Sequence, residues 1–255
     1  LDIYIFTHQI YRENGRPVDP VPLVRENGIL RVGEEWRRWY KVEQHKRGDN
    51  GEILYVECGR PDYFFRNDGE KGFVDVTEEV GITKERHWGN SATWWDYNND
   101  GWPDLYVGND FSSPDFLYRN NGDGTFTEVA EKHVRHTTWF SMGAVQSDLN
   151  NDGYIDFLLA DMMPRTHYMQ MASMASMADR HDNLEHVGGA QQIMRNTLHI
   201  NTGTDKFLEG AWLAGIAQTE WTWAIRSADF DNDGLSDLFF CNGVPRQFNH
   251  SDLPE

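Results

Sequence analysis

Cysteine is scarce in this sequence. The 255 residues contain two, Cys58 and Cys241, and no Cys-x-x-Cys pair, so a zinc ribbon and a thioredoxin-type redox motif are excluded. The two thiols could form one disulfide or remain free, and both alternatives leave the cellular compartment open. Long apolar runs are missing as well, because no stretch approaches the roughly 18 apolar residues that a membrane-spanning helix needs.

Catalytic signatures are also missing. The sequence has no P-loop, no G-x-G-x-x-G and no H-E-x-x-H motif, and its 10 histidines are scattered. No nucleophile, acid or base can be singled out from such a distribution. No catalytic residue is therefore predicted, and the chain is expected not to be an enzyme.

Basic residues are few relative to acidic ones. Lys and Arg number 23, Asp and Glu number 41, and the formal net charge is −18. This balance disfavours nucleic acids and anionic membranes as partners, because both carry negative charge. Hydrophobic residues make up 39% and aromatic residues 13%, which argues against disorder. The acidity suits divalent cations, since much of it is clustered.

Three segments repeat the pattern D-x-[ND]-N-D-G-x-x-D. They begin at Asp96, Asp148 and Asp229, and a short apolar run rich in β-forming residues follows each one directly. A second element precedes each loop and consists of two strand-like runs joined by an Asn/Gly/Asp turn, which predicts a β-hairpin. Its copies are residues 63–73, 116–126 and 197–207. A further strand, usually carrying Trp, lies between hairpin and loop, so the unit is about four short strands, the blade of a β-propeller.

The spacing of the loops predicts where the blades are extended. The loops start 52 residues apart and then 81 apart. The first interval fits one blade, and the second leaves room for an insertion at residues 161–192. Residues 1–5 match the run after the first loop, so Asp2 is expected at the ninth position of another loop, and residues 7–58 form a second insertion. Residues 1–255 are thus predicted to be part of one all-β propeller domain with about four blades visible.

Each loop can gather the oxygen ligands that calcium requires. Calcium takes about six to eight oxygens, which side chains at positions 1, 3, 5 and 9 and a carbonyl at position 7 can supply. Gly at position 6 permits the sharp turn, and magnesium suits such flexible carboxylate cages less well. About three calcium ions are expected. The predicted ligands are Asp96, Asn98, Asp100, the carbonyl of Trp102 and Asp104; Asp148, Asn150, Asp152, the carbonyl of Tyr154 and Asp156; and Asp229, Asp231, Asp233, the carbonyl of Leu235 and Asp237.

The loops have two other interpretations. An EF-hand requires Glu at position 12 and flanking helices, whereas Val107, Leu159 and Phe240 stand there and a strand follows, so it is excluded. Asp, Asn and Gly also make tight turns without any metal. Three matching loops, each with Asp at position 9, favour metal binding over that alternative.

The loops resemble the FG-GAP/VCBS repeats of integrin α-chain propellers. Other stretches resemble bacterial propeller proteins related to cartilage acidic protein, a group that often carries an ASPIC/UnbV domain: residues 119–126, 160–164, 194–198, 228–234 and 242–246. The resemblance covers about residues 59–250 and the first six, and no ASPIC/UnbV domain is recognisable. It implies a secreted, calcium-stabilised propeller, often seven-bladed, and this chain is expected to be a portion of a longer protein.

Methionine and tryptophan are unevenly placed. Met171, Met174 and Met177 recur at every third position, which predicts a short helix packed on the propeller. A thioether copper site is the functional alternative. Tryptophans at recurring blade positions are expected in the core, namely Trp94, Trp139, Trp221 and Trp223. Three others could form a glycan-stacking surface: Trp36, Trp39 and Trp88.

Binding is the expected function. The chain is predicted to be a calcium-binding extracellular or cell-surface propeller for protein interaction, adhesion or scaffolding, located outside the cell, on its surface or in the periplasm. Its partners would be other proteins of an envelope or extracellular assembly, contacted through the long insertions, with glycans as a second class. The alternative is a glycan-binding lectin, or a polysaccharide lyase or hydrolase, because propellers also host enzymes whose sites come from several blades.

Overall fold

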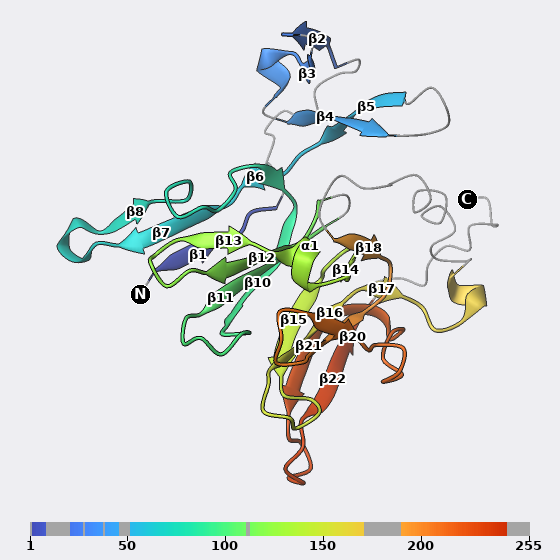
Figure 1. The fold of residues 1–255 in the computed structure, drawn as a ribbon. Coiled ribbons are helices and arrows are strands. Elements are labelled where there is room, and N and C mark those ends of the chain that lie inside the picture. The colour runs from blue at the N-terminus through green and yellow to red at the C-terminus, as the bar shows by residue number, and fades with distance from the viewer. Residues whose placement is uncertain are drawn as a thin grey trace.

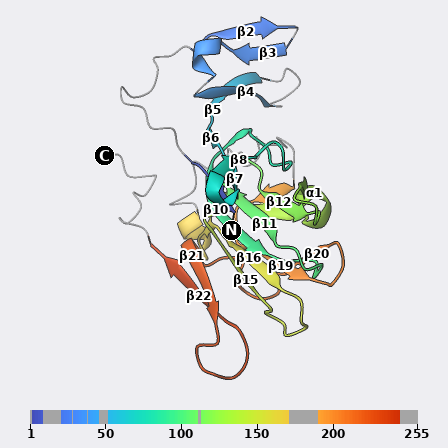
Figure 2. The ribbon, with the colours of Figure 1, turned by 90° about the vertical axis from the view of Figure 1, so that its left-hand side faces the viewer.

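Short antiparallel sheets dominate the chain. The computed structural model describes residues 2–8, 21–27, 29–37, 39–45, 52–110, 113–170 and 190–243. Within these residues the sheets of successive sequence segments lie side by side, as Figures 1 and 2 show. We number the four successive sheets as the first to fourth blades.

The second and third blades are complete four-stranded meanders with strand orders β10-β11-β12-β13 and β15-β16-β19-β20. Their registers match, since Leu105 faces Tyr118 in one and Phe157 faces His199 in the other. In both pairs the residue after the ninth-position aspartate faces the third residue of the next strand. The strands are β10 (Gly89–Trp95), β11 (Asp104–Asn109), β12 (Phe116–Asn120), β13 (Phe126–Glu128), β15 (Gly143–Ser147), β16 (Asp156–Ala160), β19 (Thr197–Asn201) and β20 (Phe207–Glu209).

The first and fourth blades contain fewer strands within the described residues. The first has the order β1-β7-β8, and Ile3 faces Phe65 in the same register, so β1 is the counterpart of β11. In the fourth, β21 pairs with β22, and β17 of the preceding blade adds to β21. The strands are β1 (Ile3–Ile5), β7 (Tyr63–Asn67), β8 (Phe73–Asp75), β17 (Met162–Met163), β21 (Glu220–Ala228) and β22 (Asp237–Asn242). The prediction of an all-β propeller with about four visible blades is confirmed.

Most of the remaining elements belong to the segment between β1 and β7. They form two hairpins, β2 with β3 and β4 with β5, which stand above the blades in Figure 1. Strand β6 then pairs with β9, which directly precedes the second blade. The elements are β2 (Leu23–Glu26), β3 (Ile29–Val32), η1 (Glu34–Trp36), β4 (Tyr40–His45), β5 (Glu52–Glu57), β6 (Arg60–Pro61) and β9 (Arg86–His87).

Short elements complete the fold. They are η3 (Gly69–Lys71), α1 (Ala130–His133) and a parallel pair formed by β14 (His136–Thr138) and β18 (Gln191–Ile193). Residues 167–170 are helical, which confirms a helical turn in the methionine-rich segment. Met171, Met174 and Met177 lie outside the described residues. No helix in the described ranges combines the length and the apolar character needed to cross a bilayer.

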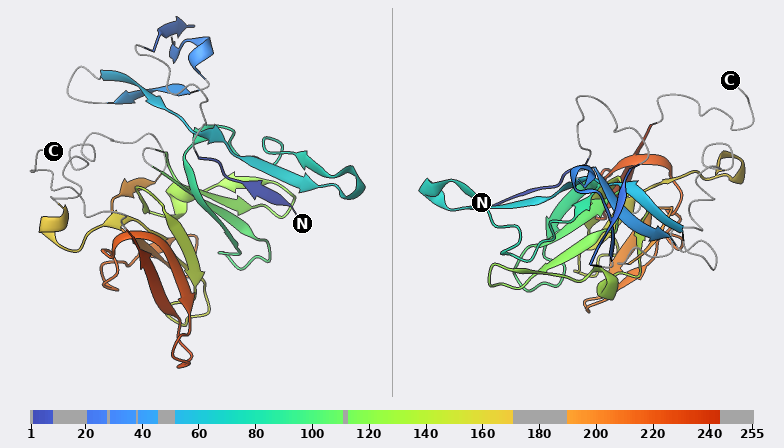
Figure 3. Two further views of the ribbon diagram at one scale, coloured as in Figure 1. Left: turned by 180° about the vertical axis from the view of Figure 1, so that it is seen from behind. Right: turned by 90° about the horizontal axis from the view of Figure 1, so that it is seen from above.

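The acidic loops and the two predicted insertions lie at opposite ends of the blades. Strand β1 begins directly after Asp2, strands β11 and β16 begin at a ninth-position aspartate, and all three end at the connection to the hairpin. The insertions predicted at 7–58 and 161–192 fall in the first and third of these connections. In Figures 1 and 3 the three acidic loops accordingly point away from β2 to β5. The domain boundaries themselves stay predictions.

Neighbouring blades pack through their apolar faces, and Phe157 lies at the centre of one such contact. It is fully buried, and its ring centroid lies 5.2 Å from that of Trp95 and 5.1 Å from that of Tyr106 in the second blade. Within its own blade it stacks on His199 at 4.2 Å and contacts Phe207 at 5.0 Å. One aromatic ring thus joins two blades.

Two expectations about single residues need correction. Trp139 is buried and Trp221 is half-buried, but Trp94 is 42% and Trp223 47% exposed, so the expected core position is wrong for these two. Successive side chains of a strand point to opposite faces, and Trp95 takes the core side of β10 in place of Trp94. The disulfide alternative is not realised either, because Cys58 and Cys241 are both free.

A buried aspartate fastens the end of the blade remote from the acidic loop. Asp115, which precedes β12, accepts hydrogen bonds from the Asn109 amide at 2.7 Å, the Tyr106 hydroxyl at 2.6 Å and the Ser141 hydroxyl at 2.5 Å. Burial raises the pKa of Asp115 to about 7, and the charge of Asp110 adds to this increase. The three hydrogen bonds lower the pKa and offset part of the increase. The side chain therefore ties β11 to β12 at an electrostatic cost.

The same connection recurs in the neighbouring blades. Asp62, which precedes β7, accepts the Thr7 amide at 2.7 Å and the Tyr4 hydroxyl at 2.6 Å. Asn196, which precedes β19, accepts the Asp161 amide at 2.8 Å. The loop pattern did not reveal these residues, although each stands directly before the hairpin strand and could have been found by aligning the blades on that strand.

Removing the Phe157 ring should loosen two blades together. We expect Phe157→Ala to lower the free energy of unfolding by about 3–5 kcal/mol, as is typical of a buried aromatic residue in a packed core. Phe73→Ala is the matched control, because Phe73 is 51% exposed, and its effect should be below about 1 kcal/mol. Equal losses in urea denaturation of the two variants would contradict the central role of Phe157.

The raised pKa of Asp115 predicts a pH dependence of stability. Between pH 3.8, the ordinary pKa of an aspartate, and about pH 7, the pKa in the native state, Asp115 is protonated in the native protein and ionised in the unfolded chain. The free energy of unfolding must therefore fall as pH rises through this window. Asp115→Asn removes the titration and should make this decline shallower in urea denaturation at a series of pH values. Asp123→Asn is the control, because hydrogen bonds from Thr125 lower the pKa of Asp123; an unchanged slope in Asp115→Asn would refute the assignment.

Candidate metal loops

The first acidic loop is folded by its own side chains. The Asp96 carboxylate accepts the amides of Asp100 at 3.1 Å and Gly101 at 2.8 Å. The Asn98 side-chain oxygen accepts a hydrogen bond from the Asp100 amide at 3.1 Å. The Asp100 carboxylate accepts one from the Trp102 amide at 2.9 Å. Gly101 has a φ of +89°, where a side chain would be strained. The sixth position therefore requires glycine, as the sequence pattern predicts.

The other two loops repeat this geometry. Asp148 accepts the Gly153 amide at 2.8 Å, and Asp229 accepts that of Gly234 at 2.9 Å. The fifth-position aspartates, Asp152 and Asp233, accept the amides two residues further on at 2.9 and 2.8 Å. Three segments that are far apart in the sequence thus adopt one conformation.

The ninth-position aspartate links each loop to the neighbouring hairpin. Asp104 is fully buried and accepts the Tyr97 amide at 3.1 Å within the loop and the Asn120 amide at 2.7 Å at the end of β12. Asp156 is also fully buried and makes the corresponding bonds to the Leu149 amide at 3.0 Å and the Asn201 amide at 2.8 Å. One carboxylate therefore joins the loop, the following strand and the hairpin.

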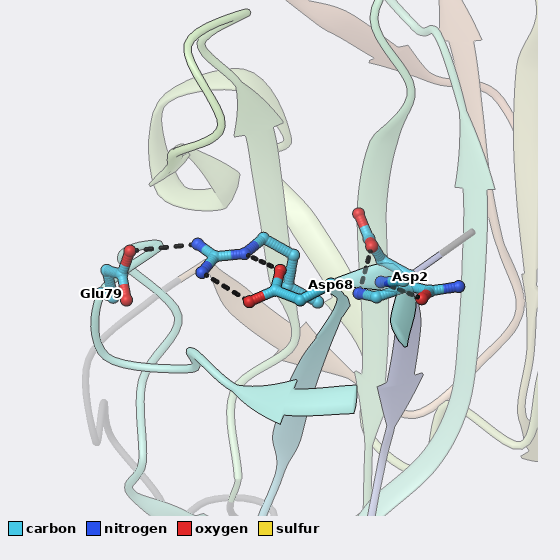
Figure 4. A network of polar contacts seen from close by, with 6 residues as sticks. Asp2, Asp68 and Glu79 are labelled. Atoms are coloured by element: carbon cyan, nitrogen blue, oxygen red, sulfur yellow. Dashed lines mark hydrogen bonds and ion pairs between the residues drawn. The ribbon is translucent and has the colours of Figure 1, made fainter. Parts of the chain in front are cut away.

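Asp2 occupies the same place in the first blade. Its carboxylate accepts the Asn67 amide at 2.8 Å, as Asp104 accepts that of Asn120 (Figure 4). The prediction that Asp2 stands at a ninth position is confirmed by this contact. The neighbouring Arg66 pairs with Asp68 at 2.8 Å and with Glu79 at 3.2 Å, also drawn in Figure 4.

Burial, and to a smaller extent the neighbouring carboxylates, raises the pKa of the ninth-position aspartate in the first two loops. Burial raises the pKa of Asp104 to about 6, and the charges of Asp100 and Asp96 raise it further, while the amides of Asn120 and Tyr97 act in the opposite direction. Burial likewise raises the pKa of Asp156, with smaller increases from Asp152 and Asp148. A bound cation would offset this repulsion.

The donor set fits calcium best in the third loop. One oxygen each of Asp229, Asp231 and Asp237 lies within 4.8 Å of the others. Asp233 is not part of this group, although it was predicted as a ligand. The first two loops carry Asn98 and Asn150 at the third position, so they have fewer carboxylates. All these side chains offer oxygen, the ligand atom that calcium prefers, and the residues present are compatible with the predicted ion.

The seventh position has a role that the sequence did not reveal. A Cβ on Gly122 would lie 2.8 Å from Nε1 of Trp102, and one on Gly203 would lie 2.5 Å from Cζ of Tyr154. The aromatic side chain of the loop therefore covers the turn of the hairpin in the same blade, and only glycine leaves room for it. The sequence predicts only a carbonyl ligand at this position, from Trp102, Tyr154 and Leu235. The signal for the packing is an aromatic residue at position 7 of the loop together with an Asn-x-Gly turn in the hairpin.

Two substitutions should separate the structural carboxylate from the metal-binding ones. In excess chelator, Asp104→Ala should lower the free energy of unfolding by about 2–4 kcal/mol, because it leaves one buried and one partly buried amide without an acceptor. Asp100→Ala removes an exposed carboxylate, and its effect in chelator should stay below about 1 kcal/mol. Urea denaturation measures both. If Asp100→Ala were as destabilising as Asp104→Ala without metal, the division between the two positions would be wrong.

Comparison with known proteins agrees with this geometry. A model described as FG-GAP-like repeat matches residues 50–107 and 96–159, which include the first two acidic loops. Cartilage acidic protein 1 of Xenopus tropicalis is 25% identical over 191 residues, and the human protein of the same name is 26% identical over 191 residues. The alignments cover 72% of this chain but only 25% and 24% of those proteins, so the chain spans about a quarter of their length. The chain therefore carries FG-GAP-like repeats, and its fold is the β-propeller that such repeats form.

Proposed function

We propose that this chain is a calcium-binding β-propeller that acts as a protein-interaction or adhesion module outside the cytoplasm. The observation that carries the proposal is the common geometry of the loops at 96–104, 148–156 and 229–237, in which oxygen donors crowd at one end of each blade. Such crowding is costly without a cation and favourable with one.

The compartment follows from the expected affinity. Calcium sites of extracellular modules bind with dissociation constants of roughly 10⁻⁴–10⁻³ M. Sites of that strength fill outside the cell and stay empty in a cytosol that is kept low in calcium. An extracellular, cell-surface or periplasmic location is therefore part of the proposal.

The interaction role rests on the opposite end of the blades. The segment with β2 to β5 and the segment that follows β16 both leave from that end, where connections can vary without disturbing the sheets. Proteins of an envelope or extracellular assembly are the proposed partners, in keeping with the resemblance to cartilage acidic protein 1.

Calcium removal tests the proposal. Excess chelator should lower the melting temperature, calcium should restore it, and magnesium should restore it poorly. Each filled site stabilises the native state by about 2.7 kcal/mol at a hundredfold excess of calcium over its dissociation constant. Titration calorimetry should count about three ions bound in the loops.

A variant with Asp100, Asp152 and Asp233 all changed to Ala is the matched control. These carboxylates are exposed, so the variant should fold as the parent does in chelator but gain no stability from added calcium. A melting curve of the parent protein that does not change in chelator, with metal removal verified by elemental analysis, would refute the stabilising role of calcium and the compartment argument that depends on it.

A further inference from the structure

An arginine-lined pocket lies where the segment with β2 to β5 meets β9. Its volume is about 400 Å³, and its apolar wall comes from Leu30, Val32, Tyr40 and Val42. Three arginines complete the lining, namely Arg31, Arg37 and Arg86. In a protein with a formal net charge of −18, such a concentration of positive charge around an apolar cavity is unusual and points to an anionic ligand.

Both parts of the chain hold the pocket in place. Arg86 belongs to β9, which pairs with β6, and its guanidinium donates to the Arg37 carbonyl. A Cβ on Gly59 would lie only 1.8 Å from the His87 carbonyl oxygen, so the two backbones pass each other closely. The Cys58 amide also donates to the Trp39 carbonyl at 2.9 Å. The guanidinium of Arg86 is thus held against the segment that supplies the apolar wall.

Among the residues that the structure describes, carboxylates do not balance the charges of the pocket. Glu26 forms an ion pair with Arg37, and its other oxygen lies 3.8 Å from Nε of Arg31. Among the described residues Arg86 has no carboxylate partner. In this part of the chain, one carboxylate thus pairs with two of the three arginines. Since the side chain of Glu26 is 45% exposed, its pairs are worth little net free energy, and a carboxylate from outside can compete for them.

The lining defines the chemical class of the ligand. Guanidinium groups bind carboxylates through paired hydrogen bonds, and the aliphatic side chains favour an apolar body behind the charge. A polyhydroxylated sugar acid fits less well, because Tyr40 is 7% exposed and offers little ring face for stacking. The volume of about 400 Å³ falls in the usual range of roughly 300–1,000 Å³ for small-ligand sites. We propose that this pocket binds a carboxylate carried on an apolar body, either a peptide C-terminus with an aliphatic last residue or a short aliphatic acid.

Direct binding to the intact, calcium-saturated protein tests the proposal. The probes are the peptide acetyl-Ala-Leu-Val with a free carboxylate, the same peptide as its C-terminal amide, and hexanoate. The free-acid peptide, hexanoate or both should bind in titration calorimetry, and the amide should bind about tenfold more weakly or not at all. Binding of the peptide alone identifies a peptide C-terminus, and binding of hexanoate alone a free acid. Equal binding of acid and amide, or no binding of either acid, would overturn the proposal.

Two variants with opposite expected effects assign the binding to the pocket. Glu26→Gln frees Arg31 and Arg37 and should tighten binding of the acid several-fold. Arg86→Gln should weaken it about tenfold, and Arg66→Gln, which makes the same charge change outside the pocket, should leave it unchanged. Because Arg86→Gln also removes the bond to the Arg37 carbonyl, the gain in Glu26→Gln is the decisive result. Weaker or unaltered binding in Glu26→Gln, or equal losses in Arg86→Gln and Arg66→Gln, would refute the site.

Discussion

A buried carboxylate at the first residue of a strand is the contact on which the blades depend. Asp104 uses one oxygen for the Tyr97 amide of its own loop and the other for the Asn120 amide of the hairpin. Burial of this charge is costly, and the raised pKa of about 6 reflects that cost. Hydrogen bonds from two amides offset part of it, and a cation among the neighbouring carboxylates would offset more. The acidic loop is therefore part of the blade's own packing and not an appendage to it.

Aromatic packing makes this contact cooperative with the hairpin. Trp102 covers the turn at Gly122, and Tyr154 does the same at Gly203. If either loop moved, it would break the hydrogen bonds of its ninth-position aspartate and expose the hairpin turn at the same time. At the other strand end, Asp115 and its counterparts hold two successive strands together. The connection between those strands can therefore vary in length. This division explains why large insertions can be accommodated without loss of the blade.

Local requirements made the loops predictable from sequence. The pattern that begins at Asp96 specifies a glycine with φ of +89° and an asparagine at position 4 with φ of +55°, demands that few other residues meet. The register of Asp2 was predictable for the same reason, since the strand after it matches the strand after the first loop. The number of blades followed from repetition, but the grouping of strands did not. The hairpin was expected to precede the loop of its own unit, whereas the hairpin of β12 and β13 follows the loop at 96–104 in the same sheet.

Features that depend on packing between distant segments were not predictable. Trp94 and Trp95 are adjacent and chemically identical, and only the packing of the second blade against the third decides which is buried. The position of the Asp115 bridge can be aligned between blades, but no shared residue type marks it, because its counterpart in the third blade is Asn196. The pocket combines Arg37 with Arg86, and the sequence holds no sign that β9 lies against the segment between β1 and β6.

The three loops differ in the number of carboxylates they hold. Asp104 and Asp156 each accept the amide of a hairpin residue as well as one of their own loop. The third loop carries Asp231 where the others carry asparagine, and there three carboxylates approach one another within 4.8 Å. More negative charge leaves a larger share of the compensation to a cation. Dependence on metal should therefore be greatest in the third loop.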